Sequence, residues 1–248
     1  MQMHNPLFSL NEVSKVYENI NREKSQALSN ITISLLGNNI TCIMGNSGSG
    51  KTTLLRTIAK LETATSGTID FNYDSDKLGY VFQNNSVFPW MTVAENIGYA
   101  MKIRRIEKEN IDEKVKLLVD MVNLPQTHLN KYPKELSGGE LRRLAIASAL
   151  SKDTQLLLLD EPTSQLDDMN KWSIQDLVQR IWASKKMAVL WVTHDIEEAI
   201  YMSNQVIIMK KGQIVENVPV ELTYPRTNEM RVSPRFLALK LKISELLC

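Results

Sequence analysis

The sequence predicts an α/β protein built on a mainly parallel sheet, with an antiparallel β flank and an inserted helical subdomain. Short apolar runs of strand length recur along the chain, and they are apolar on both faces, which is typical of a buried parallel sheet. Amphipathic helical patterns lie between them, and alternation of strand and helix indicates right-handed crossovers. The runs are residues 39–44, 77–82, 155–160, 187–193 and 205–209.

The helices and the flank follow from shorter patterns. Residues 51–61 follow the first apolar run, and residues 110–122 and 171–182 each place apolar side chains on one helix face. Alternating segments bounded by turn residues predict an antiparallel flank. These segments are residues 8–19, 28–37 and 66–72, and a late hairpin is expected to turn at Lys211–Gly212.

We predict one domain over residues 1–248. Residues from about 84 to 150 are read as a helical subdomain inserted in the α/β core, because this region is rich in helical patterns and poor in strand signals. A C-terminal helical tail is expected from about 225 to 248.

Charge, hydropathy and cysteine spacing indicate the expected partners, location and thiol chemistry. The 248 residues carry 29 basic and 28 acidic side chains, so no overall field favours nucleic acid, and none is expected as a partner. No apolar run approaches a membrane span, and the N-terminus lacks a signal pattern, which predicts a cytoplasmic protein. Cys42 and Cys248 have no metal-site or disulfide spacing and are expected to be unpaired thiols.

The strongest motif is a phosphate-binding loop. Residues 45–52, GNSGSGKT, lie directly after an apolar run and directly before a helix. Backbone N–H groups of such a loop curl around phosphates, while Lys51 reaches the terminal phosphates and the Thr52 hydroxyl ligates Mg²⁺. This P-loop predicts a P-loop NTPase core that binds a nucleoside triphosphate. The expected nucleotide contacts here, which the resemblance described below makes contacts to ATP, are Gly45, Asn46, Ser47, Gly48, Ser49, Gly50, Lys51, Thr52 and Thr53.

Polar side chains end three further strands. Asp160 is expected to hold Mg²⁺, and Glu161 to deprotonate the attacking water. His194 and Gln83 follow other strands at the edge where open α/β sheets gather ligand groups. We therefore predict Glu161, His194 and Gln83 as catalytic residues, and Thr52, Gln83 and Asp160 as metal ligands.

A second helix start, LSGGE, admits two interpretations. Ser137 is a good N-cap, and Gly138 and Gly139 would allow an anion to approach the helix end. Glu140 lies three residues after Ser137, so the same letters fit a capping box with a purely structural purpose.

Six ordered motifs, GNSGSGKT, VFQ, LSGGE, LLLLDEP, SQLD and VTHD, resemble the nucleotide-binding subunit of ATP-binding-cassette transporters. The resemblance implies a head-to-tail homodimer in which Ser137, Gly138 and Gly139 contact the partner's ATP. It also implies adenine stacking by Tyr17, a link between half-sites at Asp167, and attachment to a membrane permease on the cytoplasmic face of the membrane. An extracytoplasmic solute-binding protein would take part indirectly.

Finer resemblance indicates an importer. The stretch NSVFPWMTVAENI and the C-terminal tail are similar to the ATPases of the nitrate, sulfonate and taurine group, some of whose relatives carry thiamine precursors. An exporter subunit, a soluble non-transport ATPase of the same class and an interaction module with little turnover remain alternatives. The chain departs from the usual family residues at Gln165, Glu140 and Ser148, and Glu140 would place a negative charge near the partner's phosphate.

Overall fold

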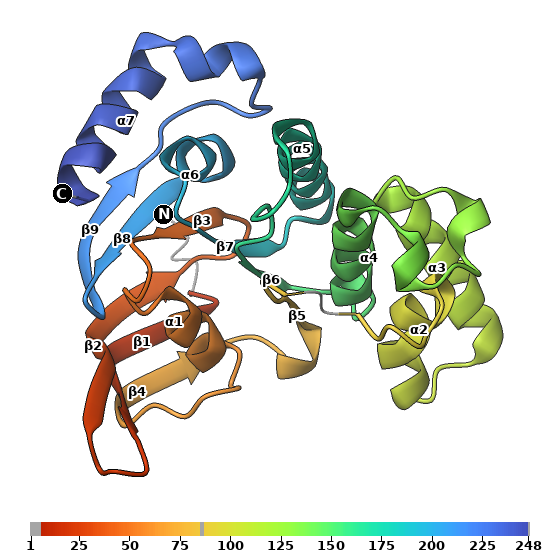
Figure 1. The fold of residues 1–248 in the computed structure, drawn as a ribbon, viewed down its shortest axis with the longest axis horizontal. Coiled ribbons are helices and arrows are strands. Elements are labelled where there is room, and N and C mark those ends of the chain that lie inside the picture. Colours follow the sequence, from red (N-terminus) through yellow and green to blue (C-terminus); the bar gives the residue numbers. More distant parts are fainter. Residues whose placement is uncertain (1–5, 85–86, 248) are drawn as a thin grey trace. The chain divides into compact units, whose positions relative to one another are not determined.

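The computed structural model describes residues 6–84 and 87–247, in two compact units (Figure 1). The first unit comprises the chain up to residue 73 and from residue 188 onward, and the second comprises residues 74–187. Asn85 and Ser86, within the importer-like stretch, and Cys248 lie outside the described residues.

The first unit contains the predicted antiparallel flank. Its strands pair in the order β2-β1-β4, and both pairings are antiparallel. The strands are β1 (Phe8–Glu18), β2 (Lys24–Leu35) and β4 (Ser66–Phe71).

The same unit holds the parallel strands of the P-loop region. Strand β3 pairs in parallel with β7 on one side and β8 on the other, and β9 returns antiparallel to β8. Every residue of β3 and β7 is buried, as the apolar runs predicted. The strands are β3 (Ile40–Met44), β7 (Ala188–Thr193), β8 (Gln205–Lys210) and β9 (Gln213–Pro219), with the expected turn at Lys211–Gly212.

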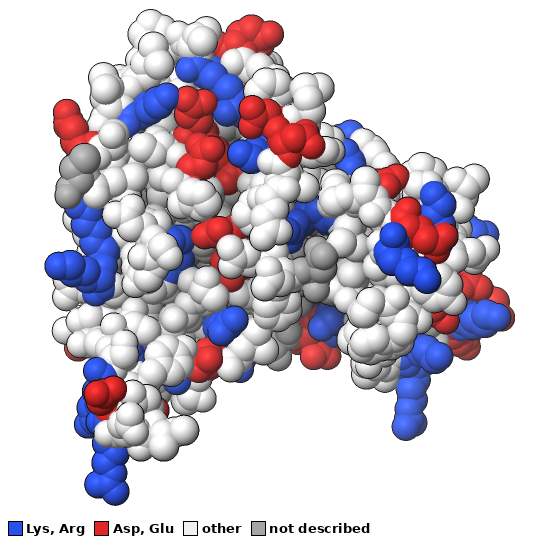
Figure 2. Space-filling model, in the orientation of Figure 1, with Lys and Arg blue, Asp and Glu red and all other residues white. Residues whose placement is uncertain are grey.

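In its described part this unit also contains the helices α1 (Lys51–Ile58), α6 (Ile196–Met202) and α7 (Pro234–Leu247). A 3₁₀ turn, Asn228–Val232, precedes α7. Helix α7 packs against α6 through buried Phe236 and Ile243, and Glu197 of α6 pairs with Lys240 and Arg231. Acidic and basic side chains are interspersed on the surface around α7 (Figure 2).

The second unit combines two parallel strands with the helical region. Strands β5 (Leu78–Val81) and β6 (Leu156–Asp160) pair in parallel, and helices α2, α3 and α4 pack on one another. The helices are α2 (Val93–Ile103), α3 (Lys108–Met121), α4 (Gly138–Leu150) and α5 (Asp168–Lys185), with 3₁₀ turns at Ser75–Lys77, Gln126–His128 and Pro133–Glu135.

These elements confirm the predicted fold class: mainly parallel strands around a P-loop, an antiparallel flank and a helical region. The limits proposed for the helical subdomain, 84–150, and for the tail, 225–248, stay predictions. Cys42 is a buried free thiol in β3, and burial raises its pKa well above the ordinary value. Within the described ranges, no helix has the length and hydropathy needed to cross a bilayer.

Candidate active site

The P-loop joins β3 to α1 and presents an unblocked helix start. Gly50 is the N-cap with a φ of 100°, and among the residues that the structure describes no side chain caps the helix or places an acid in its first turn. A Cβ at Gly50 would lie 2.4 Å from the Ala27 carbonyl oxygen, so both the backbone and the space require glycine. A helix start of this kind is suited to binding an anion.

The polar side chains of the loop suit a phosphate ligand. Lys51 is only 6% exposed, and its Nζ donates to the carbonyl oxygens of Gly45 at 2.7 Å and Asn46 at 3.0 Å. The Ser49 hydroxyl is buried and has no hydrogen-bond partner among the described residues. A positive charge, an orphaned hydroxyl and a helix start without a side-chain cap thus converge on one loop, and this donor set fits ATP phosphates.

His194 belongs to the same edge of the parallel strands. The β3–β7 register pairs Met44 with Thr193, so Gly45 and His194 leave neighbouring strands at the same level. His194 is exposed at this edge. The register brings it beside the start of the P-loop, where a polar contact to a phosphate or to water would be needed.

Tyr17 lies on β1, within the antiparallel sheet. Its ring is 38% exposed, and the Lys15 ammonium lies 4.9 Å from the ring centroid. An exposed ring on a strand is suited to stacking on a base. The adenine role of Tyr17 remains a prediction.

The two predicted carboxylates lie at the end of β6, in different surroundings. Asp160 is 3% exposed, and the hydroxyl of Tyr80, on the neighbouring strand β5, donates to its Oδ2 at 3.4 Å. Glu161 follows with a φ of 45°, a conformation that costs a non-glycine residue about 1–3 kcal/mol. Ser164 supports this turn by donating through its backbone N–H and its hydroxyl to the Glu161 carbonyl.

Gln83 and Glu161 are brought together directly. The Nε2 of Gln83 donates to Oε2 of Glu161 at 3.0 Å, although 78 positions separate the two residues along the sequence. An amide that donates to a carboxylate orients it without adding charge. Two of the three predicted catalytic residues therefore form one hydrogen-bonded pair.

The start of α4 is capped. The backbone N–H of Glu140 donates to the Ser137 hydroxyl at 3.3 Å, and the backbone N–H of Ser137 donates to Glu140 Oε2 at 2.8 Å. The Ser137 hydroxyl also donates to Oε2, and these bonds lower the pKa of Glu140. The capping box is thus real, while Gly138 and Ser137 stay exposed at the helix end.

The two glycines of α4 meet different surroundings. A Cβ at Gly139 would lie 2.6 Å from Oδ1 of Asn170, whereas one at Gly138 would come no closer than 3.6 Å to Leu166. Gly139 therefore serves contact within the chain, and Gly138 leaves space at the exposed surface.

Asp167 caps α5 and is tied to the same region through Asn170. Its carboxylate accepts from the backbone N–H of Asn170 at 3.0 Å and from the side-chain amide at 2.7 Å, and these bonds lower its pKa. Sequence reasoning missed Asn170, Tyr80 and Arg142, which donate hydrogen bonds to Asp167, to Asp160 and to the Gln83 carbonyl, respectively. The first departure noted above, Gln165, lies on this turn with a φ of 69°.

The P-loop fold and the phosphate-binding donor set define this chain as a P-loop ATPase. A family model described as "ABC transporter" matches residues 28–164, more than half of the chain. The chain belongs to the ABC transporter family, and it is an ATP-binding, ATP-hydrolysing enzyme of that family.

Individual relatives agree with this assignment. The chain is 38% identical over 242 residues to the aliphatic sulfonates import ATP-binding protein of Bacillus thuringiensis, covering 95% of this chain and 93% of the relative. Its identity to the corresponding protein of Bacillus subtilis is 36%, over 89% of this chain and 86% of that one. A dimeric post-hydrolysis structure of an ATP-binding cassette, bound to ADP and Pi, matches with a TM-score of 0.78 and 28% identity, covering 87% of this chain and 100% of that one.

Proposed function

We propose that the chain is the ATPase subunit of an importer for a small sulfonate-type anion. The buried Lys51 ammonium at the unblocked start of α1 carries the ATP-binding part of this proposal. The sulfonate import relatives support the direction of transport and the class of solute. Because the ATPase does not contact the solute in this reading, nitrate, taurine and thiamine-precursor importers stay the alternatives for the cargo.

In this proposal the chain works as a head-to-tail homodimer at the cytoplasmic face of the membrane. The dimeric cassette structures support the dimer. Each P-loop binds one ATP, and Ser137, Gly138 and Gly139 of the partner close over it. Tyr17 supports the adenine, and Asp167 lies on the turn that links the half-sites.

Hydrolysis is assigned to the residues that end the parallel strands. Glu161 accepts a proton from the attacking water, so that the oxygen attacks the terminal phosphorus while ADP leaves. Gln83 orients the Glu161 carboxylate through the 3.0 Å hydrogen bond, and His194 contacts the terminal phosphate or the water. We assign Mg²⁺ to the Thr52 hydroxyl, the Asp160 carboxylate and the Gln83 amide, oxygen ligands of the kind this ion prefers, where it would neutralise phosphate charge.

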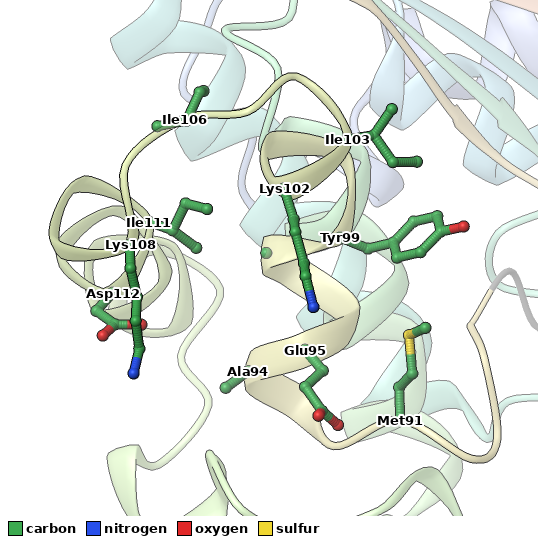
Figure 3. A pocket seen from close by; sticks show the side chains of 11 residues that line it. Met91, Ala94, Glu95, Tyr99, Lys102, Ile103, Ile106, Lys108, Ile111 and Asp112 are labelled. Atoms are coloured by element: carbon green, nitrogen blue, oxygen red, sulfur yellow. The ribbon is translucent and has the colours of Figure 1, made fainter.

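The permease is proposed to dock in a groove of the second unit. Helices α2 and α3 and the loop between them enclose a cavity of about 650 Å³ (Figure 3). Its apolar members include Tyr99, Ile103 and Ile106, which are 36%, 65% and 40% exposed. Charged side chains of both signs surround them: Glu95, Lys102, Lys108 and Asp112. Such a groove suits a short amphipathic helix of the permease.

Phe88 and Trp90, the two aromatic residues shortly before α2, differ in how they are exposed. Phe88 packs against Tyr99 at a ring separation of 4.7 Å and against Trp90 at 5.5 Å. Trp90 itself is 68% exposed. Phe88 therefore supports Tyr99, which lines the groove, while Trp90 offers surface to a partner.

A capture experiment tests the importer assignment. Tagged Glu161→Gln protein, incubated with ATP and solubilised native membranes, should recover a polytopic permease, which mass spectrometry would identify. Adding Ile103→Glu should reduce this recovery at least about tenfold, because a charge replaces an apolar contact in the groove. Leu117→Glu is the matched control, since Leu117 is a 57% exposed apolar residue of α3 that does not line the groove.

Full recovery with Ile103→Glu would place the docking site elsewhere. Recovery of only soluble or ribosomal partners would contradict the transport assignment and favour the non-transport alternative. If the chain belongs to an exporter, the permease should be recovered without any associated solute-binding protein.

The glutamate at position 140, where the family usually has glutamine, is predicted to weaken the ATP-bound dimer. Glu140→Gln should tighten the ATP-bound dimer by roughly threefold to tenfold, because it removes a negative charge beside the partner's phosphates while the cap's hydrogen bonds can persist. Sedimentation equilibrium with ATP, in the Glu161→Gln background, would measure this change. Glu135→Gln is the control for net charge, and equal tightening in both variants would contradict a local effect.

A further inference from the structure

We propose that Arg142 of α4 is a positioning residue for ATP hydrolysis, acting through Gln83 on the carboxylate of Glu161. The inference rests on the proposed role of Glu161 as the base. It adds a residue that neither the motifs nor the comparisons assign.

Arg142 is anchored to two consecutive backbone carbonyls. Its Nη1 donates to the carbonyl oxygen of Phe82 at 2.9 Å, and its Nη2 donates to that of Gln83 at 3.0 Å. Two parallel bonds from one planar guanidinium fix both the position and the orientation of this short backbone segment. Arg142 therefore determines where the Gln83 side chain begins.

The burial of Arg142 is costly, which argues for a specific use. The residue is 5% exposed, and burial lowers the pKa of its guanidinium. Across residues 6–84 and 87–247 it forms no ion pair, so no carboxylate offsets the loss of hydration. A neutral apolar side chain would pack here at lower cost, but it would leave both carbonyls without this donor.

The anchored segment lies where the strand ladder has ended. The last register pair of β5 with β6 joins Val81 to Leu159, and Phe82 and Gln83 continue beyond it. The side chain of Gln83 is exposed, yet its Nε2 reaches Glu161 Oε2. Arg142 thus supplies a fixed anchor between the end of the ladder and the hydrogen bond that orients Glu161.

Arg142 also lies one helical turn after Gly138, at the end of α4 proposed to meet the partner's ATP. A helix transmits displacement along its axis, so a shift of this helix start would move Arg142 and the segment that it holds. In the proposed dimer, Arg142 would therefore connect the helix start that meets the partner's nucleotide to the segment that orients Glu161.

Steady-state kinetics of the purified full chain tests the proposal. Arg142→Ala should lower kcat about tenfold and change KM for ATP less than about twofold, because the lost contact orients the base and leaves the nucleotide contacts in place. Arg142→Lys should recover part of the loss, because an ammonium can still donate to one or both carbonyls. Arg143→Gln is the matched control: Arg143 is adjacent on α4 but donates to the Val122 carbonyl and the Ser173 hydroxyl. Its kcat should stay within about twofold of the wild type.

A double-mutant cycle separates positioning from general support of the fold. In a Gln83→Ala background, Arg142→Ala should change kcat less than about twofold, because the side chain that it positions is gone. An unchanged tenfold effect in that background would overturn the proposal. If Arg142→Ala fails to fold by thermal melting, the same cycle with Arg142→Lys and Arg142→Gln decides the question.

The outcomes also distinguish this inference from the proposed function. Wild-type hydrolysis by Glu161→Gln would overturn the base assignment, and the role of Arg142 with it. Loss of hydrolysis in Glu161→Gln, together with independent effects of Arg142 and Gln83, would overturn the positioning role alone.

Discussion

Glu161→Gln should reduce ATP hydrolysis at least about 100-fold, the usual contribution of a general base. The amide keeps the size of the carboxylate but cannot accept the proton of the attacking water. A phosphate-release assay with Mg²⁺ and saturating ATP would measure the loss. Nucleotide binding should persist, because Glu161 directly follows β6 and the P-loop donors belong to a different segment of the chain.

A second measurement distinguishes a loss of hydrolysis from a loss of ATP binding. The variant should accumulate as an ATP-bound dimer in sedimentation velocity, since binding continues while the step that releases the dimer is blocked. Glu113→Gln, on the exposed side of α3, controls for the change in net charge and should hydrolyse ATP normally. Turnover at the wild-type rate in Glu161→Gln would contradict the assignment of the base.

The sequence predicted best those parts of the site whose residues are close together along the chain. The P-loop, the carboxylates at the end of β6 and the capping box of Ser137 and Glu140 all depend on spacings of a few residues. Periodicity located the strands β3 and β6 that precede the first two. The helices were found with shifted ends, as in α5, which begins at Asp168 and continues to Lys185.

Contacts between distant segments were not predictable from one sequence. Arg142 lies 60 positions from Phe82, and no local pattern distinguishes it from Arg143, which contacts other groups. Asn170 shows the same limit, because its contact with Gly139 depends on how α4 meets the α5 cap. The sequence therefore predicted the groups to which the chemistry is assigned, and the fold was needed to find the residues that hold them.

Lys51→Ala should weaken ATP binding by about 100-fold, the loss expected when a charge-assisted contact of about 3 kcal/mol is removed. Its Nζ lies at the two loop carbonyls of Gly45 and Asn46, at the unblocked start of α1. Alanine removes both the charge that faces the phosphates and the donor that fixes the loop. Isothermal titration calorimetry of the purified chain with Mg²⁺ and ATP would measure the change.

Lys60→Ala provides the control, because Lys60 directly follows the other end of α1 and its ammonium lies over the Phe71 ring at 4.2 Å. It removes the same charge from the same unit, so a fall in affinity through net charge alone would appear in both variants. We expect the ATP dissociation constant to change less than about twofold in Lys60→Ala, since screening by salt weakens distant charges. An unchanged dissociation constant in Lys51→Ala would mean that the loop does not bind the nucleotide through this lysine, and the phosphate-binding assignment would have to rest on the helix N–H groups alone.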